Sequence, residues 1–210
     1  MKLTETLAWR YAVKAFSPHE VPEDKLRCIL DATRMSASAY GLQPYRILVI
    51  QAPELRRQLL EHSYGQDKVL HSSNLVVFAA HTALGADAVD RYIQRAAAAR
   101  NEPVSELGAY AQQIKSALSQ MSADELVAWT KNQAYLALGN FLTAAALARV
   151  DTCPMEGFDA AGYDRVLGLP QQELTTAVIC PIGYRHPDDP YARYPKVRKP
   201  YEEMIAEIRT

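Results

Sequence analysis

The sequence predicts an α+β fold in which a small sheet lies between layers of helices. Three β-rich segments, at about 45–51, 75–80 and 174–182, are separated by long stretches whose apolar residues recur at helical spacing. The 210 residues are 49% hydrophobic and 22% charged, which is the balance of an ordinary globular protein. Because no Gly/Ser-rich or Pro-rich linker divides the sequence, we expect one domain over residues 1–210.

The first part of the chain alternates helices and strands. A short helix is expected at about 3–10 and a second at about 22–35, which begins with a proline in a favourable first helical position. The strand at 45–51 is followed by a short helix at about 53–62. The segment 75–80 (LVVFAA) is apolar on both faces, which predicts a central strand covered on both sides.

The middle of the chain is expected to be helical. Two helices are predicted at about 87–100 and 102–118, and a Ser-x-x-Glu capping box at 122–125 opens a long one. From 133 to 148 this helix carries no charge, so we expect it to be buried within the domain or against a partner. Gly139 costs the helix about 1 kcal/mol relative to alanine, which suggests close packing at that point.

The C-terminal part contains one more helix, the third strand and a polar tail. The helix is predicted from Asp159 to about Gly168, and Pro181 predicts that the strand 174–182 ends at a sheet edge or a bulge. The tail, about 184–210, has four prolines and ends in a short amphipathic stretch. It must lie on its own domain, reach across to a second subunit, or stay loose.

Composition excludes several classes of function. The charge of 23 basic minus 24 acidic residues is −1, so no general attraction to nucleic acid is expected. The longest apolar run is far shorter than the roughly 20 residues of a membrane helix, so we expect no membrane partner. Three scattered cysteines favour a reducing, cytoplasmic compartment. Dinucleotide-binding, P-loop and nucleophile-elbow motifs are absent, and the histidines lack metal-ligand spacing.

Two segments in the first part of the chain are unusual for a plain core. In RYAVK, at 10–14, two cations four residues apart flank an aromatic residue, which suits an anionic ligand, although a solvated helix face is the commoner interpretation. The loop SASAYG, at 36–41, has the small and hydroxyl-bearing residues that let a ligand approach the backbone. An ordinary helix-to-strand connection explains the loop equally well.

Two later segments are also candidates. The turn PMEG, at 154–157, offers backbone N–H groups to an acceptor, or is a simple turn. The basic cluster KVRK, at 196–199, lies between two prolines and would suit phosphate, because arginine binds phosphate through two hydrogen bonds. A run of charge is more often only solvated.

Together these segments resemble the FMN-dependent nitroreductase family, and in particular the oxygen-insensitive NAD(P)H nitroreductases. The matching pieces, in family order over nearly the whole chain, are RYAVKAF, SASAYGLQPYR, YGQDKV, QAYLALGNFLTAAAL, PMEGFD and PKVRKP. The resemblance implies an intertwined α+β homodimer with a small, mostly antiparallel sheet and one FMN at each side of the dimer interface. The tail would reach toward the partner subunit, and the uncharged helix would form much of the dimer core.

The resemblance also implies which residues contact the cofactor. They are Arg10, Tyr11, Ala12, Lys14, Ser36, Ser38, Tyr40, Gln66, Lys68, Pro154, Met155, Glu156, Gly157, Lys196 and Arg198. Arg10, Lys196 and Arg198 would bind the phosphate. Lys14 would lie at the pyrimidine edge, which Gln66 and Lys68 would also approach. The 36–41 loop would come from the other subunit, and the backbone of Glu156 and Gly157 would address flavin N5 and O4.

Two departures from the family pattern affect these contacts. Ala37 and Ala39 stand where many relatives have proline and serine, which limits the contacts of these two residues to backbone and apolar ones. Lys68 stands where the nearest relatives carry glutamine, so an extra cation either raises the flavin potential or points to solvent.

The activity that the resemblance implies is a ping-pong reaction. NADH or NADPH would reduce FMN at N5, and the reduced flavin would pass two electrons to a nitroaromatic, a quinone or a related small-molecule acceptor, with no catalytic side chain required. One alternative keeps the enzyme and changes the acceptor to an enone, a pteridine or free flavin. Others are a flavin-binding protein for storage or redox sensing, and a helical scaffold whose basic tail docks a protein partner.

Overall fold

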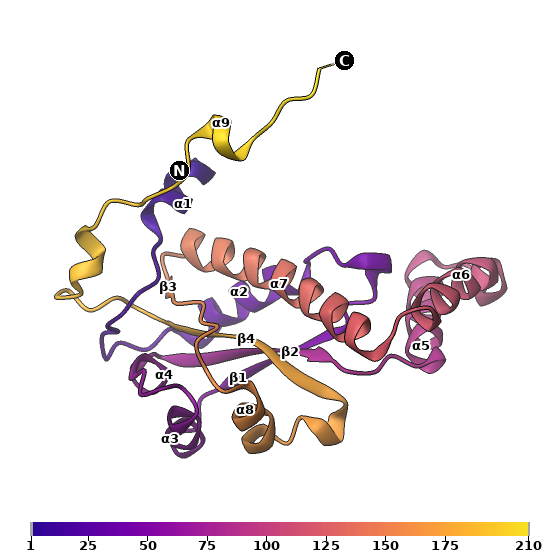
Figure 1. Ribbon diagram of the computed structural model, residues 1–210, viewed down its shortest axis with the longest axis horizontal. Helices are drawn as coiled ribbons and strands as arrows, with labels where there is room; N and C mark the ends of the chain where they lie inside the picture. The colour runs from indigo at the N-terminus through magenta and orange to yellow at the C-terminus, as the bar shows by residue number, and fades with distance from the viewer. Residues whose placement is uncertain (1, 210) are drawn as a thin grey trace.

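A computed structural model describes residues 2–209 and contains one four-stranded antiparallel sheet (Figure 1). The strands lie in the order β1-β2-β4-β3 and are β1 (Tyr45–Ile50), β2 (Asn74–His81), β3 (Asp151–Thr152) and β4 (Leu174–Gly183). The three predicted strands are confirmed. The fourth, β3, is only two residues long and gives no sequence pattern of its own.

Helices occupy the predicted segments with shifts in their bounds, except that α4 is not predicted and that the helix expected at about 102–118 begins only at Gly108, after a 3₁₀ turn. They are α1 (Leu3–Trp9), α2 (Glu23–Arg34), α3 (Pro53–Glu61), α4 (Lys68–His71), α5 (Ala86–Arg100), α6 (Gly108–Ser119), α7 (Ala123–Leu147), α8 (Ala160–Leu167) and α9 (Tyr201–Met204). Short 3₁₀ turns are η1 (Ala39–Gly41), η2 (Val104–Leu107), η3 (Pro170–Gln172) and η4 (Pro190–Arg193). The capping box of α7 is present, with Ser122 and Glu125 bonded to each other's backbone N–H.

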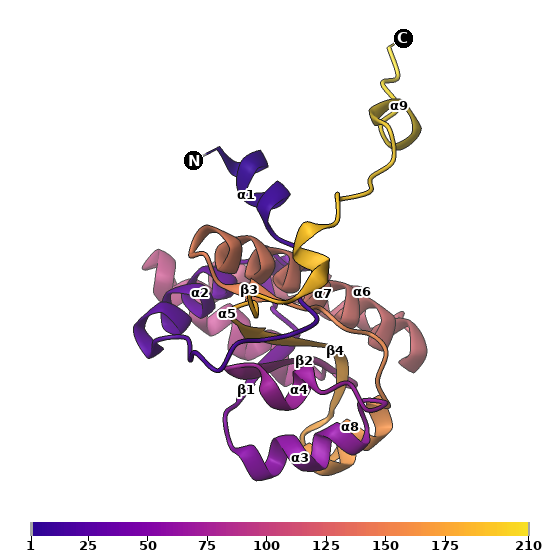
Figure 2. The ribbon, with the colours of Figure 1, turned by 90° about the vertical axis from the view of Figure 1, so that its left-hand side faces the viewer.

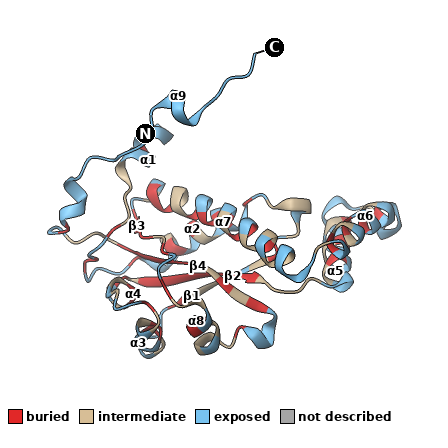
Figure 3. Cartoon of the chain, in the orientation of Figure 1, coloured by how far each residue is buried: buried red, intermediate tan, exposed pale blue. Residues whose placement is uncertain are grey.

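The sheet is covered on both faces, as the apolar β2 sequence predicts (Figures 1 and 3). Val76 and Phe78 of β2 face α2 and α7, and the Phe78 ring meets Phe141 edge-on at 5.7 Å. Leu75 and Val77 point to the opposite face, where α3, α4 and α8 cover them. The outlying pair α5 and α6 has a smaller apolar core of its own (Figure 1).

The exposed side of α7 corrects one prediction. A Cβ placed at Gly139 would have no neighbour within 4 Å, so the expected close packing does not exist within one chain. Leu136 and Leu147 on the same side are 54% and 53% exposed. The face of α7 toward the sheet is buried, whereas from residue 133 onward the other face is uncharged, mostly apolar and open.

Pro181 is also not at a sheet edge or a bulge. It lies in the interior strand β4, opposite Leu75 of β2, and its carbonyl accepts a hydrogen bond from the Cys153 N–H at 3.0 Å. The nitrogen of Pro181 faces the same side of the strand as its carbonyl, which is the side toward β3. The proline is tolerated because pairing with the short β3 begins only at Ile182, so no N–H is needed at Pro181. The register irregularity between β2 and β4 lies earlier in β4, between Thr176 and Val178, opposite Ala79 and Phe78.

The tail projects from the body beyond η4 (Figure 2). Val197 is 84% exposed and Ile208 is 90% exposed, and the amphipathic stretch forms only the single turn of α9. None of the helices in the described part of the chain is long and apolar enough to cross a bilayer.

Candidate functional site

The first predicted segment forms an extended strand rather than a helix. After α1 ends at Trp9, the backbone becomes extended at Arg10, and Ala12 pairs in parallel with Thr152 of β3. We call residues 10–15 the N-terminal strand segment. The helix-face interpretation of Arg10 and Lys14 is therefore wrong. Val13 is buried in the core, whereas Arg10, Tyr11 and Ala12 are half-buried and Lys14 is exposed.

This segment and the tail enclose a pocket of about 450 Å³. Its walls are formed by residues within 8–14 and 191–198, which are far apart in sequence. Six of the predicted site residues line it together, namely Arg10, Tyr11, Ala12, Lys14, Lys196 and Arg198. No aspartate or glutamate is among the described residues that line the pocket.

The pocket is strongly cationic and leaves a buried donor unused. The Nε atom of Arg10 is buried and has no hydrogen-bond partner among the described residues. Burial lowers the pKa of Arg10, and the nearby charge of Arg198 lowers that pKa further. An unpaired guanidinium donor beside like charges is costly, and an anion with several oxygens would satisfy it.

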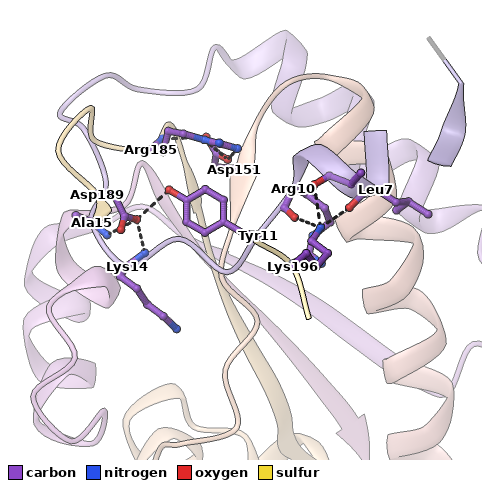
Figure 4. A network of polar contacts seen from close by, with 10 residues as sticks. Leu7, Arg10, Tyr11, Lys14, Ala15, Asp151, Arg185, Asp189 and Lys196 are labelled. Atoms are coloured by element: carbon purple, nitrogen blue, oxygen red, sulfur yellow. Dashed lines mark hydrogen bonds and ion pairs between the residues drawn. The ribbon is translucent and has the colours of Figure 1, made fainter. Parts of the chain in front are cut away.

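Lys196 is used differently from the prediction. Its ammonium donates to the carbonyls of Leu7 at 2.5 Å, Ala8 at 3.1 Å and Arg10, so all three of its N–H donors cap the end of α1 (Figure 4). Its charge still adds to the pocket, and burial together with Arg10 and Arg198 lowers the pKa of Lys196.

The 154–157 turn is fixed against the sheet and α7. Met155 exchanges two backbone hydrogen bonds with Ile179 of β4, at 2.8 and 3.3 Å. The Tyr135 hydroxyl of α7 donates to the Glu156 carboxylate at 2.5 Å. This turn therefore has a rigid position beside the sheet, and its two exposed residues, Glu156 and Gly157, face outward.

Gln66 and Lys68 join the 154–157 turn to the start of α4. The Lys68 ammonium donates to Gln66 Oε1 at 2.9 Å, and Gln66 Nε2 donates to the Gly157 carbonyl at 2.6 Å. Burial lowers the pKa of Lys68, and the positive charge of Lys14 acts in the same direction. Cys153 is buried between the two lysines, whose charges partly oppose the rise that burial causes in the pKa of its thiol.

The 36–41 loop lies elsewhere in the chain. Ser36 Oγ accepts a hydrogen bond from Asn140 at 2.9 Å, and the Ala39 N–H donates to Gln133 at 2.8 Å, so the loop rests on the middle of α7. Trp9, beside the pocket, instead stacks on Arg149 just beyond the end of α7, at 4.7 Å. Ser36, Ser38 and Tyr40 are thus not brought into the pocket within one chain.

Asp189 is a site residue that our sequence analysis missed. Its carboxylate binds the backbone of Lys14 and the hydroxyl of Tyr11, as Figure 4 shows. The only local signal is the pair Asp189-Pro190, which is typical of a turn. Nothing local predicts a contact with residues 175 positions earlier.

This fold, with a cationic pocket at one side of a small antiparallel sheet, is that of the nitroreductases. The chain belongs to the nitroreductase family, whose model matches residues 7–184. A relative in Bacillus subtilis (strain 168), named as the NAD(P)H nitroreductase YfkO, is 31% identical over 219 residues, covering 97% of this chain and 96% of the relative.

Solved structures agree in fold. The nitroreductase ydfN from Bacillus subtilis has a TM-score of 0.87 at 22% identity, covering 98% of each chain. A nitroreductase from Exiguobacterium sibiricum, solved in complex with FMN, has a TM-score of 0.84 at 18% identity, covering 99% of this chain and 98% of the other.

Proposed function

We propose that this chain is an FMN-dependent NAD(P)H oxidoreductase that reduces nitroaromatics, quinones or related acceptors by a ping-pong transfer of two electrons. The observation that carries the proposal is the buried, unpartnered Nε of Arg10 in a pocket that three further cations line and that, among the described residues, no acid lines. A phosphomonoester with a charge near −2 would supply the missing acceptor oxygens. Membership of the nitroreductase family supports the same conclusion.

The pocket residues fit FMN in distinct roles. Arg10 and Arg198 would bind the phosphate directly, whereas Lys196 would act through its charge because its N–H donors are already used. Tyr11 and Ala12 would lie along the ribityl chain and the ring. FMN, when bound, supplies the hydride chemistry, so the protein need only bind, orient and stabilise charge.

Lys14 and Lys68 would provide positive potential at the pyrimidine edge. Negative charge develops there on reduction, so two cations favour the reduced cofactor. Gln66 holds Lys68 and the 154–157 turn together through its two hydrogen bonds. The Pro154 and Met155 backbone would pack at the ring, and the N–H groups of Glu156 and Gly157 would address N5 and O4.

We also propose that the site is completed in a homodimer. A second copy would supply Ser36, Ser38 and Tyr40, which one chain keeps away from the pocket. The open apolar face of α7 and the exposed tail at about 184–210 support an extensive interface.

The tail also has a chemically matched place to bind. A groove of about 860 Å³ beside the edge strand β1 has apolar walls and is lined by Arg34, Arg46, Arg95 and Arg100. The tail carries both apolar and acidic residues, including Met204, Ile205 and Ile208 with Glu202, Glu203 and Glu207.

The three cysteines are free thiols, which supports a cytoplasmic location.

An absorption spectrum tests the function directly. Purified protein incubated with FMN should show bands near about 370 and 450 nm that bleach when NADH or NADPH is added without oxygen. Bands that persist would favour a flavin-binding protein for storage or sensing. A colourless protein would refute the cofactor assignment.

A substitution tests the phosphate site. Arg198→Ala should weaken FMN binding by roughly 1–3 kcal/mol, the value of a charged hydrogen bond. Fluorescence titration measures the dissociation constant. Lys199→Ala is the matched control, because Lys199 is a neighbouring tail cation that does not line the pocket. An unchanged FMN dissociation constant for Arg198→Ala would refute the assignment of Arg198 to the phosphate.

A further inference from the structure

Asp189 is a buried carboxylate that binds the N-terminal strand segment. It follows β4, opens η4 and is 1% exposed. Its Oδ2 atom accepts hydrogen bonds from the N–H groups of Lys14 at 2.8 Å and Ala15 at 3.2 Å, and from the Tyr11 hydroxyl at 3.0 Å (Figure 4). Its Oδ1 atom accepts from the N–H of Tyr191 at 3.0 Å.

The charge of Asp189 is balanced by these donors. Within residues 2–209 it forms no ion pair with a lysine, arginine or histidine. Burial acts to raise the pKa of Asp189, but the backbone donors and the Tyr11 hydroxyl outweigh it, so the pKa lies below its ordinary value. The ionised carboxylate therefore stabilises a particular backbone position.

That backbone position belongs to Lys14. Oδ2 fixes the Lys14 N–H, and Oδ1 fixes the start of the turn whose Tyr191 ring lies 5.7 Å from the Lys14 ammonium. Figure 4 shows the Lys14 side chain pointing away from the carboxylate. Asp189 thus sets where the side chain starts and which ring lies beside it, without neutralising the ammonium.

We propose that Asp189 is a positioning residue, which holds the Lys14 ammonium in place against the pyrimidine edge of FMN. This inference rests on the proposed function, since it takes Lys14 as the residue that stabilises the reduced cofactor. Asp189 itself touches no part of the cofactor. If a unit charge moves from about 4 to about 5.5 Å in an effective dielectric of about 20, the equilibrium constant that it supports falls roughly sevenfold.

The experiment is a redox titration of the FMN-loaded protein carrying Asp189→Asn. The amide cannot accept at both oxygen positions, so Lys14 should shift. Displacement of the ammonium should weaken binding of reduced FMN roughly three- to tenfold relative to oxidised FMN, apart from the effect of losing the Asp189 charge itself. For a two-electron couple this lowers the midpoint potential by about 15–30 mV.

The matched control is Asp164→Asn. The Asp164 carboxylate likewise accepts a backbone N–H, from Thr176 at 2.7 Å, and a hydroxyl, from Thr175 at 2.7 Å. It connects α8 to β4 and does not line the pocket. Asp164→Asn should destabilise the fold and leave the potential unchanged, which separates positioning from general stability.

A double-mutant cycle with Lys14→Met tests whether Asp189 acts on the potential through Lys14. Asp189→Asn also removes a negative charge, which by itself raises the potential in both backgrounds. The shift with Lys14 present should therefore be more negative than the shift in Lys14→Met, by the amount that displacement of the ammonium causes. An equal shift of the potential in both backgrounds, or no shift in either, would overturn the positioning role of Asp189 and leave the proposed function standing. A native protein that binds no FMN would instead refute the proposed function. Should Asp189→Asn fail to fold, Asp189→Ser keeps an oxygen for the Tyr191 N–H and enters the same cycle.

Discussion

Arg56 offers the sharpest test of how the scaffold supports the site. It lies in α3, is 6% exposed and has no carboxylate partner among the described residues. Its guanidinium donates to the carbonyls of Val69 at 2.9 Å, Ser73 at 3.1 Å and Ser72, and to the Ser72 hydroxyl at 2.9 Å. These bonds hold the connection between α4, which begins at Lys68, and β2.

The substitution Arg56→Met keeps an apolar stem and removes every donor. Three carbonyls would lose a charged partner, and each unsatisfied buried group costs about 1–3 kcal/mol. The substitution also removes the cost of burying a charged guanidinium, a cost that shows in the lowered pKa of Arg56. The losses at the three carbonyls therefore do not simply add. We expect a loss of about 3–5 kcal/mol in the free energy of unfolding.

Urea unfolding at a fixed protein concentration measures this loss as a fall in the midpoint at constant slope. Arg57→Met is the matched control, since Arg57 is the next residue and pairs with Glu54 at 2.5 Å while remaining 60% exposed. Its effect should stay within about 0.5 kcal/mol. A loss below about 1 kcal/mol for Arg56→Met would refute the view that this arginine organises the connection.

Three further predictions concern the loop, the carboxylate and the open helix face. Gly41 has a φ of +75° and a Cβ there would lie 3.0 Å from the Tyr92 hydroxyl, so Gly41→Ala should cost at least about 1 kcal/mol in thermal unfolding. Because the folded pKa of Asp189 is depressed, its stabilising contribution is present above the unfolded pKa of about 3.9 and is lost as the pH falls through the folded pKa. Acid unfolding of Asp189→Asn should therefore show a shallower pH dependence than that of the native protein. Leu136→Lys should weaken the proposed dimer in sedimentation experiments, whereas a Lys substitution at exposed Val104 on η2 should not.

Local patterns predict the elements of this fold well because most of those elements are locally determined. The capping box of α7 and the unbroken apolar run of β2 each require only neighbouring residues. Periodicity fails in the 10–14 segment, because a spacing of four residues fits both a helix and an extended strand. The extended conformation is stabilised over the helix by the pairing of Ala12 with Thr152, which lies 140 positions away.

The site was predictable only in part, for a related reason. The basic residues at 10–14 and 196–198 carry a family pattern, and the structure brings them into one pocket. The contacts that hold them there have no such pattern. Asp189 joins Lys14 across 175 positions, and the donors of Lys196 are used by carbonyls of α1, which any sequence could provide.

In the proposed function, the arrangement of the pocket would link cofactor binding to assembly. One chain gathers the cations of Arg10, Lys14, Lys196 and Arg198 in one pocket, while its own 36–41 loop is held at the middle of α7 by Gln133 and Asn140. In the proposed dimer, each site therefore needs loops from both chains. A ligand that binds only the assembled state stabilises that state in proportion to the logarithm of its concentration. FMN should then lower the protein concentration at which dimers dissociate, and Arg10→Ala should abolish that effect while leaving the open face of α7 intact. If dissociation were equally sensitive to FMN in Arg10→Ala, the phosphate pocket would not be the link between the two.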